Sequence, residues 1–271
     1  MIMEYITSRF ESVAEFSGYL SKGETQPYFK DDPSSQDEDR PTWHGTKSYA
    51  EADRLFKCGD TETKRRIETA AGGAAKLSSF GVATQTSRVR AMTGYKVSIG
   101  AYLSGSPKCF IKRAKVERMG RTATIVFNLT YPCYVDVQDM AKTAACLVKA
   151  VLRTERERGI KFNVYVTFCT RSSGTTAISL VKVKSSSQWF NLNTMAYSLA
   201  NPSMLRRHFF RWLEVTPNIP YGFVSGYGNI VSEKDKIGQA INAAGVKYDY
   251  ILDGYTMLGK TPEQIHDIIN S

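Results

Sequence analysis

Residues 122–170 constrain the fold most, because they combine a strand pattern, a long amphipathic helix pattern and a second strand pattern. Residues 123–129 are a β-branched and aromatic run of strand length, and Tyr131-Pro132 prevents its continuation as a central strand. From Val137 the apolar residues recur at helical spacing as far as Gly159, a residue suited to end a helix. Residues 161–169 then alternate apolar and polar side chains, as strands do. This order predicts a βαβ unit with a right-handed crossover.

Further strand and helix patterns indicate the fold class. Strands are expected over residues 177–184 and 248–252, and helices over 191–200, from Asn201-Pro202 onward, over 233–244 and after Thr261-Pro262. From Thr122 onward we interpret the element order as βαββααβα. This order predicts an α/β three-layer sandwich with a von Willebrand A-like or Rossmann-like core.

The N-terminal part is predicted to be a helical appendage. Phe10, Val13, Phe16 and Leu20 have the spacing of an amphipathic helix. A capping box at Ser48 begins a helix that should end at Gly59, and residues 61–77 suggest a second helix, weakened at its two glycines. Residues 30–40 are predicted to be an exposed acidic loop. We therefore divide the chain into an N-terminal helical region with this loop, 1–83, and an α/β core domain with a basic leading segment, 84–271.

The net charge of +10 is concentrated in one part of the chain. Between Thr69 and Val135 the only acid is Glu117, against ten Lys and Arg residues. Such a window predicts a polyanionic partner, or an acidic segment elsewhere in the chain that screens it. The acidic residues that would do so are Asp31, Asp32, Asp37, Glu38 and Asp39.

Aromatic residues alternate with the bases of this window. Residues 95–101 have strand-like alternation, and residues 109–119 fit a strand or an extended arm. Cations contact phosphates, while aromatic rings stack on unpaired bases and contribute about 1–3 kcal/mol each. The alternative is a solvated basic face with its tyrosines in the core. The predicted nucleic-acid-binding residues are Arg88, Arg90, Tyr95, Lys96, Tyr102, Lys108, Lys112, Arg113, Lys115, Arg118 and Arg121.

Other patterns give little support to catalysis or to a bound metal. The three histidines have no metal-ligand spacing, the five cysteines form no C-x-x-C pair, and there is no P-loop motif. We expect reduced thiols, no catalytic residues, no metal and no cofactor. Asp136, after the first core strand, is expected to cap the helix that begins at Val137. The acids that a metal-dependent nuclease would draw on are Glu51, Asp53, Asp136, Asp139, Glu214, Asp249 and Asp253.

Three blocks resemble an uncharacterised protein family of tailed bacteriophages, prophages and other mobile elements. They are WHGTKSY at 43–49, followed by Glu51-Ala52 and Gly59-Asp60; GAYLSGSP at 100–107; and NPSMLRRHFFRWLE at 201–214. The resemblance extends over residues 43–228 and implies a phage origin, but no chemistry.

The core also resembles the von Willebrand A-type fold, in which a D-x-S-x-S motif after the first strand holds a divalent metal. Residues 128–132, with the sequence NLTYP, occupy that position here. Because hard cations prefer anionic oxygen ligands, no metal is expected at this place.

These observations predict a phage-encoded, non-catalytic accessory protein that binds single-stranded DNA or RNA through its basic segment. The alternative is a protein-interaction adaptor on a degenerate von Willebrand A-like core that serves a phage or host machine. A third interpretation is a divalent-metal nuclease. No apolar run reaches membrane-spanning length, and residues 1–10 lack a signal-peptide pattern. We therefore expect no membrane partner and a location in the cytoplasm of an infected bacterial host.

Overall fold

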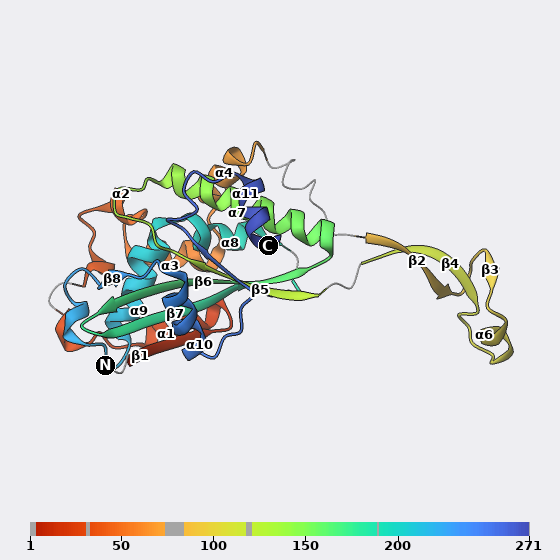
Figure 1. Cartoon of the computed structure of the whole chain (residues 1–271), viewed down its shortest axis with the longest axis horizontal. Helices are drawn as coiled ribbons and strands as arrows, with labels where there is room; N and C mark the ends of the chain where they lie inside the picture. The colour runs from red at the N-terminus through yellow and green to blue at the C-terminus, as the bar shows by residue number, and fades with distance from the viewer. Residues whose placement is uncertain (1–3, 31–32, 74–83, 118–120, 189, 271) are drawn as a thin grey trace.

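The computed structural model describes residues 4–30, 33–73, 84–117, 121–188 and 190–270. Residues 4–73 and 121–270 form a unit that we name the body, which is a sheet flanked by helices. Residues 84–117 form the arm, a second sheet of three strands that projects from one end of the body (Figure 1).

Within the described ranges, the sheet of the body has six strands in the order β1-β7-β6-β5-β9, with β8 paired to the end of β6. β5 is parallel to β6 and β9, β1 is parallel to β7, and β7 and β8 are antiparallel to β6. The predicted βαβ unit is confirmed, since β5, α7 and β6 follow one another and the two strands are parallel. The strands are β1 (Glu4–Phe10), β5 (Thr122–Asn128), β6 (Lys161–Ser172), β7 (Thr175–Lys184), β8 (Asn229–Ile230) and β9 (Tyr250–Asp253).

The long crossover helix α7 (Val137–Arg158) begins and ends where its cap residues predict. The side chain of Asp136 accepts a hydrogen bond of 2.8 Å from the backbone N–H of Asp139. Gly159 follows the last turn with a φ of 66°, a left-handed conformation that glycine adopts without steric cost. Met140 and Val148 are among the buried residues on its apolar face. The expected N-cap role of Asp136 is therefore confirmed.

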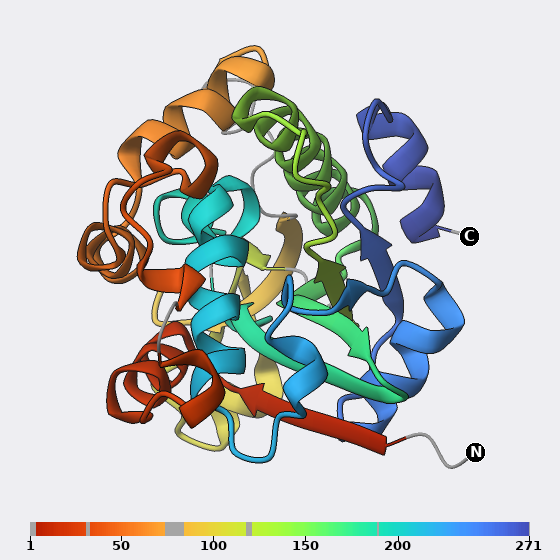
Figure 2. The same cartoon turned by 90° about the vertical axis from the view of Figure 1, so that its left-hand side faces the viewer.

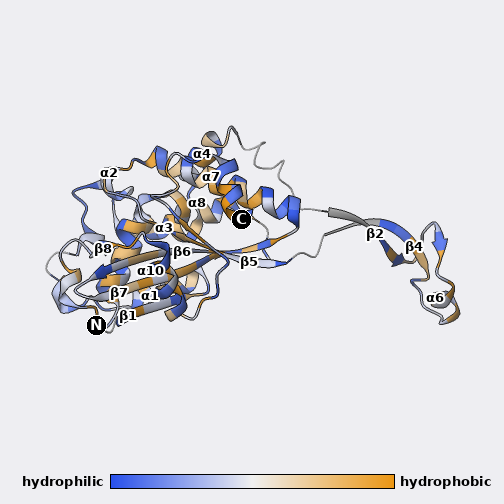
Figure 3. Ribbon diagram, in the orientation of Figure 1, coloured by the Kyte–Doolittle hydropathy of each residue, from blue (hydrophilic) through white to orange (hydrophobic). Residues whose placement is uncertain are grey.

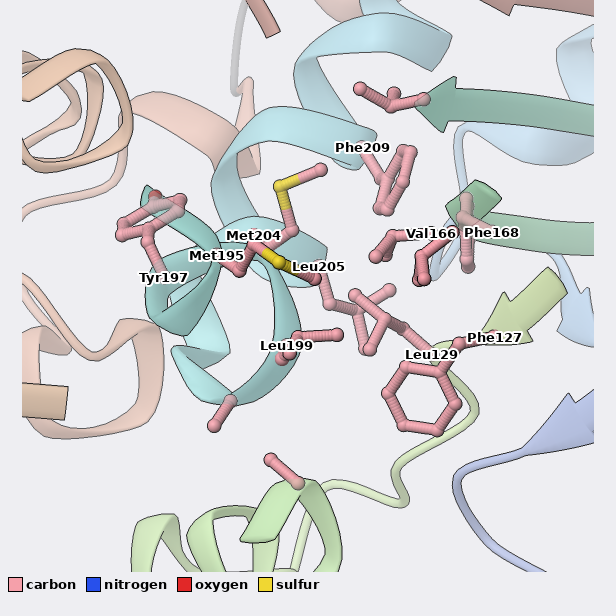
Figure 4. Close-up of a cluster of buried hydrophobic side chains, with 14 of the residues drawn as sticks. Phe127, Leu129, Val166, Phe168, Met195, Tyr197, Leu199, Met204, Leu205 and Phe209 are labelled. Atoms are coloured by element: carbon pink, nitrogen blue, oxygen red, sulfur yellow. The ribbon is translucent and has the colours of Figure 1, made fainter. Parts of the chain in front are cut away.

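Alternate residues of the central strands pack into different layers. Ile125 and Phe127 of β5 belong to a large cluster with helices on one face, whereas Val126 packs with Ile237 and Ile241 of α10 on the other face. Figure 4 shows the large cluster, where Phe127 and Phe168 face side chains from the helical layer. Because both faces of the sheet are covered, the structure is the three-layer α/β sandwich expected from the sequence.

The helices of the body are mostly short. Within the described ranges, none combines the length and the hydrophobicity needed to cross a bilayer. They are α1 (Val13–Lys22), α2 (Pro41–His44), α3 (Tyr49–Cys58), α4 (Thr61–Ala70), α7, α8 (Leu192–Ala200), α9 (Phe210–Val215), α10 (Lys234–Ala243) and α11 (Pro262–Asn270), with the π-helix η3 (Met204–Phe209) and the 3-10 turns η1 (Pro27–Phe29), η2 (Ser34–Gln36) and η4 (Tyr221–Phe223).

The N-terminal region contributes a strand to the main sheet as well as helices. β1 pairs with β7 from Glu4 to Phe10 and lies at the edge of the sheet (Figure 2, red). Phe16 of α1 and Phe56 of α3 enter the same large cluster as the sheet. The division at residue 83 therefore does not separate two cores. Helical spacing predicted the segment around Phe16, but the pairing of β1 with a strand far along the chain has no local signature.

Two local expectations are corrected. The segment at 30–40 is not a wholly exposed loop: η2 lies within it, and Ser35 is fully buried. The strand expected over 95–101 is limited to β3 (Lys96–Val97), because the helical turn α6 (Ile99–Leu103) begins two residues later. In that turn the backbone N–H of Tyr102 donates to the carbonyl of Ser98 at 2.9 Å. Part of the second predicted helix, residues 74–77, lies outside the described residues.

We expect Trp212→Ala to lower the free energy of unfolding by about 3–5 kcal/mol, because Trp212 is fully buried in the large cluster and its removal leaves a cavity. Chemical denaturation measures this change. The control is Tyr134→Ala, which truncates an aromatic side chain that is 74% exposed and should cost less than about 0.5 kcal/mol. Equal stability of the two variants would contradict the assignment of Trp212 to the core.

Candidate nucleic-acid interface

The arm carries basic residues on one face of its sheet. Its strands are β2 (Thr84–Ala91), β3 and β4 (Phe110–Glu117), with β4 in the middle. Arg88 lies opposite Arg113, and both Arg90 and Lys96 lie opposite Ile111. Directly opposed residues of an antiparallel pair point to the same side of the sheet, and successive residues alternate. Arg88, Arg90, Lys96 and Arg113 therefore share one face, which we name the basic face.

The basic face lacks compensating negative charge. Its four cationic side chains are exposed, and none forms an ion pair with any residue that the structure describes. Residues 84–116 contain no Asp or Glu at all. Arg88 and Arg113 are directly opposed, and like charges in this position destabilise a strand pair. An anionic partner bound to this face would offset the repulsion between the two arginines.

Two tyrosines accompany these cations on the surface of the arm. Tyr95 is 59% exposed and Tyr102 is 66% exposed, so the alternative in which they belong to the core does not hold. The guanidinium carbon of Arg113 lies 5.9 Å from the centre of the Tyr95 ring, within the range of a cation–π contact. An exposed aromatic ring next to an unpaired cation is the combination that a nucleotide can use.

The other predicted binding residues occupy different positions. Lys112 lies opposite Val89 and thus on the reverse face, and Lys108 is exposed between α6 and β4. Arg121 is exposed at the start of β5, in the body, where its carbonyl accepts from the backbone N–H of Lys161. Lys115 pairs with Thr86 by register, but its side chain lies outside the described part, as does the whole of Arg118. The predicted residues thus do not form one continuous surface.

The sequence pattern did not predict the exposed apolar side chains at the outer end of the arm. Met92, Ile99 and Leu103 are 68%, 71% and 78% exposed. Figure 3 shows hydrophobic stretches in α6, beyond the more hydrophilic strands. The alternation over residues 95–101 predicted a strand, whereas Ile99 begins the helical turn α6. The serine, glycine and proline residues at 104–107 predicted a turn at the end of this segment, but not the exposure of its apolar side chains.

At the base of the β3 turn, Gly94 passes very close to β4. A Cβ atom at this position would lie 2.2 Å from the carbonyl oxygen of Ile111. Only glycine permits this approach, so Gly94 sets how the end of the arm folds back on the sheet.

The acidic segment is poorly placed to screen the basic face. Residues Asp37, Glu38 and Asp39 directly precede α2, which lies at the end of the body away from the arm (Figure 1). Asp37 accepts from the Arg40 guanidinium at 2.7 Å, and this hydrogen bond holds the pKa of its carboxyl below the ordinary value. The charge of Asp37 is thus used locally.

At the carboxyl edge of the sheet, Asn128 and Thr130 form a buried hydrogen-bonded cluster with Asp253. Thr130 Oγ1 donates to Asp253 Oδ2 at 2.5 Å, and Asn128 Nδ2 donates to the same oxygen at 3.2 Å. Thr256 N–H donates to the other carboxyl oxygen at 3.0 Å. Burial raises the pKa of Asp253, against the effect of these donors. Across the described ranges, no three His, Cys, Asp or Glu residues form a group able to hold a metal ion.

The remaining acids considered for a nuclease have structural partners or lie apart. Asp53 pairs with Lys57 at 2.6 Å, and Glu51 accepts from the backbone N–H of Lys47 at 2.7 Å. Asp249 accepts from the backbone N–H of Thr124 at 2.7 Å. Glu214 is fully buried and accepts from Ser35 N–H and Oγ and from the Tyr227 hydroxyl. These contacts explain the acids as parts of the fold.

The first and third sequence blocks pack against each other as a structural clasp. The buried Arg207 side chain donates to Thr46 Oγ1 at 2.8 Å and to the carbonyls of Thr46 and Ser35 at 2.9 Å each. Asn201 Nδ2 donates to Asp60 at 2.7 Å. Gly45 has a φ of 84°, and an added Cβ would lie 2.9 Å from Asn201 Oδ1. The residues of these two blocks therefore hold N-terminal segments on the helical layer.

A scan against protein-family models matched residues 3–267 to a domain of unknown function, DUF7192. The chain belongs to the DUF7192 family. Searches of curated proteins and of solved structures returned no match. The DUF7192 match extends over both the body and the arm, so the arm lies within the range of this family model.

Two buried histidines next to the clasp predict a pH dependence of stability. Burial lowers the pKa of His208, whose Nδ1 lies 2.9 Å from the Tyr197 hydroxyl, and that of His44 to about 4. An unfolded histidine titrates near pH 6.5. The unfolded chain therefore binds more protons below that pH, and stability should fall as the pH drops from about 6.5 toward 4.

We expect the free energy of unfolding, measured with urea at pH 7 and pH 5, to decrease less in His208→Gln than in the wild type. Tyr134→Ala, which removes an exposed side chain and no histidine, is the control and should keep the wild-type decrease. An identical decrease in all three proteins would contradict the neutral, buried state of His208.

Proposed function

We propose that this protein binds single-stranded nucleic acid through the basic face of the arm, as a non-catalytic accessory protein. The observation that carries the proposal is the set of four exposed, unpaired cations on one face of a projecting sheet. The phage origin implied by the sequence blocks belongs to the same proposal.

Charge favours a polyanion as the partner. Residues 84–117 contain seven Lys or Arg residues and one acid, Glu117, so their net charge is +6. Phosphate contacts by such residues release counterions and supply most of the sequence-independent affinity for nucleic acid. By register the four cations of the basic face lie level with residues 111–113 of β4, a length of about 7 Å at about 3.3 Å per residue, so they form one compact cluster.

The exposed tyrosines favour single strands over duplexes. In a duplex the faces of the bases are stacked on one another, whereas in a single strand they are accessible to aromatic side chains. Tyr95 lies beside Arg113, so a base stacked on its ring would place its phosphates near the basic face. Tyr102 offers a second ring toward the end of the arm.

The salt dependence of binding tests the proposal. For single strands, log K should fall against log salt by about 0.7 per phosphate contact. Replacing Arg88, Arg90 and Arg113 together by alanine should flatten the slope by about two units, since roughly three contacts are lost. Fluorescence anisotropy with labelled DNA and RNA oligonucleotides measures both quantities. The melting temperature should not decrease, because no ion pair is removed.

The neighbouring residues of β4 provide a matched control. Arg113→Ala should reduce the slope by about 0.7, whereas Lys112→Ala, on the reverse face, should leave it unchanged. Tyr102→Ala should lower affinity by about 1–3 kcal/mol without changing the slope. An absence of binding at low salt would refute the proposal and favour the protein-adaptor alternative. Equal effects of Lys112 and Arg113 would show nonspecific attraction to a basic protein.

A further inference from the structure

The outer end of the arm, which we name the tip, consists of α6 and the flanking residues 92–98 and 104–109. α6 and β3 lie farther from the body than the paired strands β2 and β4 (Figure 1). Ile99 and Leu103 are four residues apart on α6, a spacing that places side chains on the same side of a helical turn. They are 71% and 78% exposed, and the nearby Met92 is 68% exposed.

Neither the fold nor phosphate binding accounts for these apolar side chains. Within the described arm, Ala101 is the one fully buried apolar residue of α6, so Ile99 and Leu103 do not pack into a core. Cations contact phosphates, but isoleucine and leucine gain nothing from a phosphate. The tip therefore fits a partner that offers an apolar surface beside negative charge, since its own Lys96 and Lys108 are exposed beside the apolar side chains.

We propose that the arm recognises the junction between a duplex and a single strand, with the tip against the terminal base pair. This inference rests on the proposed function and specifies which form of nucleic acid the arm would recognise. The last base pair of a duplex presents an apolar face surrounded by phosphates. Isoleucine, leucine and methionine side chains are the apolar wedges that proteins insert against base steps and that unstack them.

The relative positions of the tip and the basic face fit such a junction. The Arg88–Arg113 pair lies three residues along β4 from the pair formed by Ala91 and Phe110, a distance of roughly 10 Å toward the body. A strand that leaves the duplex at the tip would thus meet Lys96 and Arg90 first, and then the Arg88–Arg113 pair. The duplex itself would lie beyond α6, where no other part of the described structure obstructs it (Figure 1).

An anionic membrane is the competing partner, because it also combines an apolar interior with surface charge. Interfacial segments enter a bilayer by only about 5–10 Å. The basic face also carries the exposed Tyr95 ring beside Arg113, which suits a base and its phosphate, whereas a layer of headgroups offers no base to stack on the ring. We therefore infer the nucleic-acid junction and treat the membrane as an outcome of the test.

The experiment compares three DNA ligands: a single strand, a blunt duplex, and the same duplex with a single-stranded tail. 2-Aminopurine in the terminal base pair reports unstacking through its fluorescence. The wild-type protein should bind the tailed duplex about tenfold more tightly than the single strand, as one additional stacking contact would give, and should raise the fluorescence. The double variant Ile99→Ser, Leu103→Ser should lose both effects and keep its affinity for the single strand.

Ile230→Ser is the matched control, since it removes an exposed isoleucine from β8 in the body and should keep both effects. Wild-type binding to single strands without a preference for the tailed duplex would overturn this inference and leave the proposed function intact. No binding to any of the three DNAs would refute the proposed function itself. Binding to phosphatidylserine vesicles that depends on Ile99 and Leu103 would overturn the inference in favour of a membrane surface.

Discussion

The burial of β5 and β6 on both faces is the constraint on which the rest of the structure depends. Successive residues of β5 enter separate hydrophobic clusters, so helices must cover both sides of the sheet. N-terminal segments complete the helical layer over the larger hydrophobic cluster. The buried side chains of Arg207 and Glu214 hold these segments in place through hydrogen bonds to residues 35 and 46. The body is thus closed around its sheet, and the buried Arg207 and Glu214 side chains serve this closure.

The position of the arm follows from the same constraint. The arm directly precedes β5 in the chain, so it leaves the body near the amino end of that strand. Ligand sites of α/β proteins usually lie at the carboxyl edge of the sheet. Here that edge contains the buried cluster around Asp253, while most of the exposed large apolar side chains of the described residues lie on the arm, together with the four cations of the basic face. The buried contacts of the body therefore stabilise the fold, and the arm provides the surface for the proposed recognition.

The sequence predicted the elements whose signals are local. Ser48 and Gly59 delimit α3 as expected, Asp136 and Gly159 delimit α7, and the alternation in residues 161–169 gives the two buried faces of β6. β1 was missed because its pairing with β7 joins residues about 170 positions apart in the chain, as between Glu4 and Thr175. The burial of Ser35 depends on Glu214, which is equally remote.

The candidate interface was predicted by composition but not by geometry. Charge and aromatic content predicted the segment in which we propose the interface, whereas only the strand register separates Arg113 from Lys112 and only the helical turn α6 exposes Ile99. Cross-linking tests the central claim most directly. A single-stranded oligonucleotide that carries 5-iodouracil should cross-link to Tyr95 or Tyr102, as identified by mass spectrometry of the full-length protein. Cross-links confined to the body, with none in residues 84–117, would contradict the account.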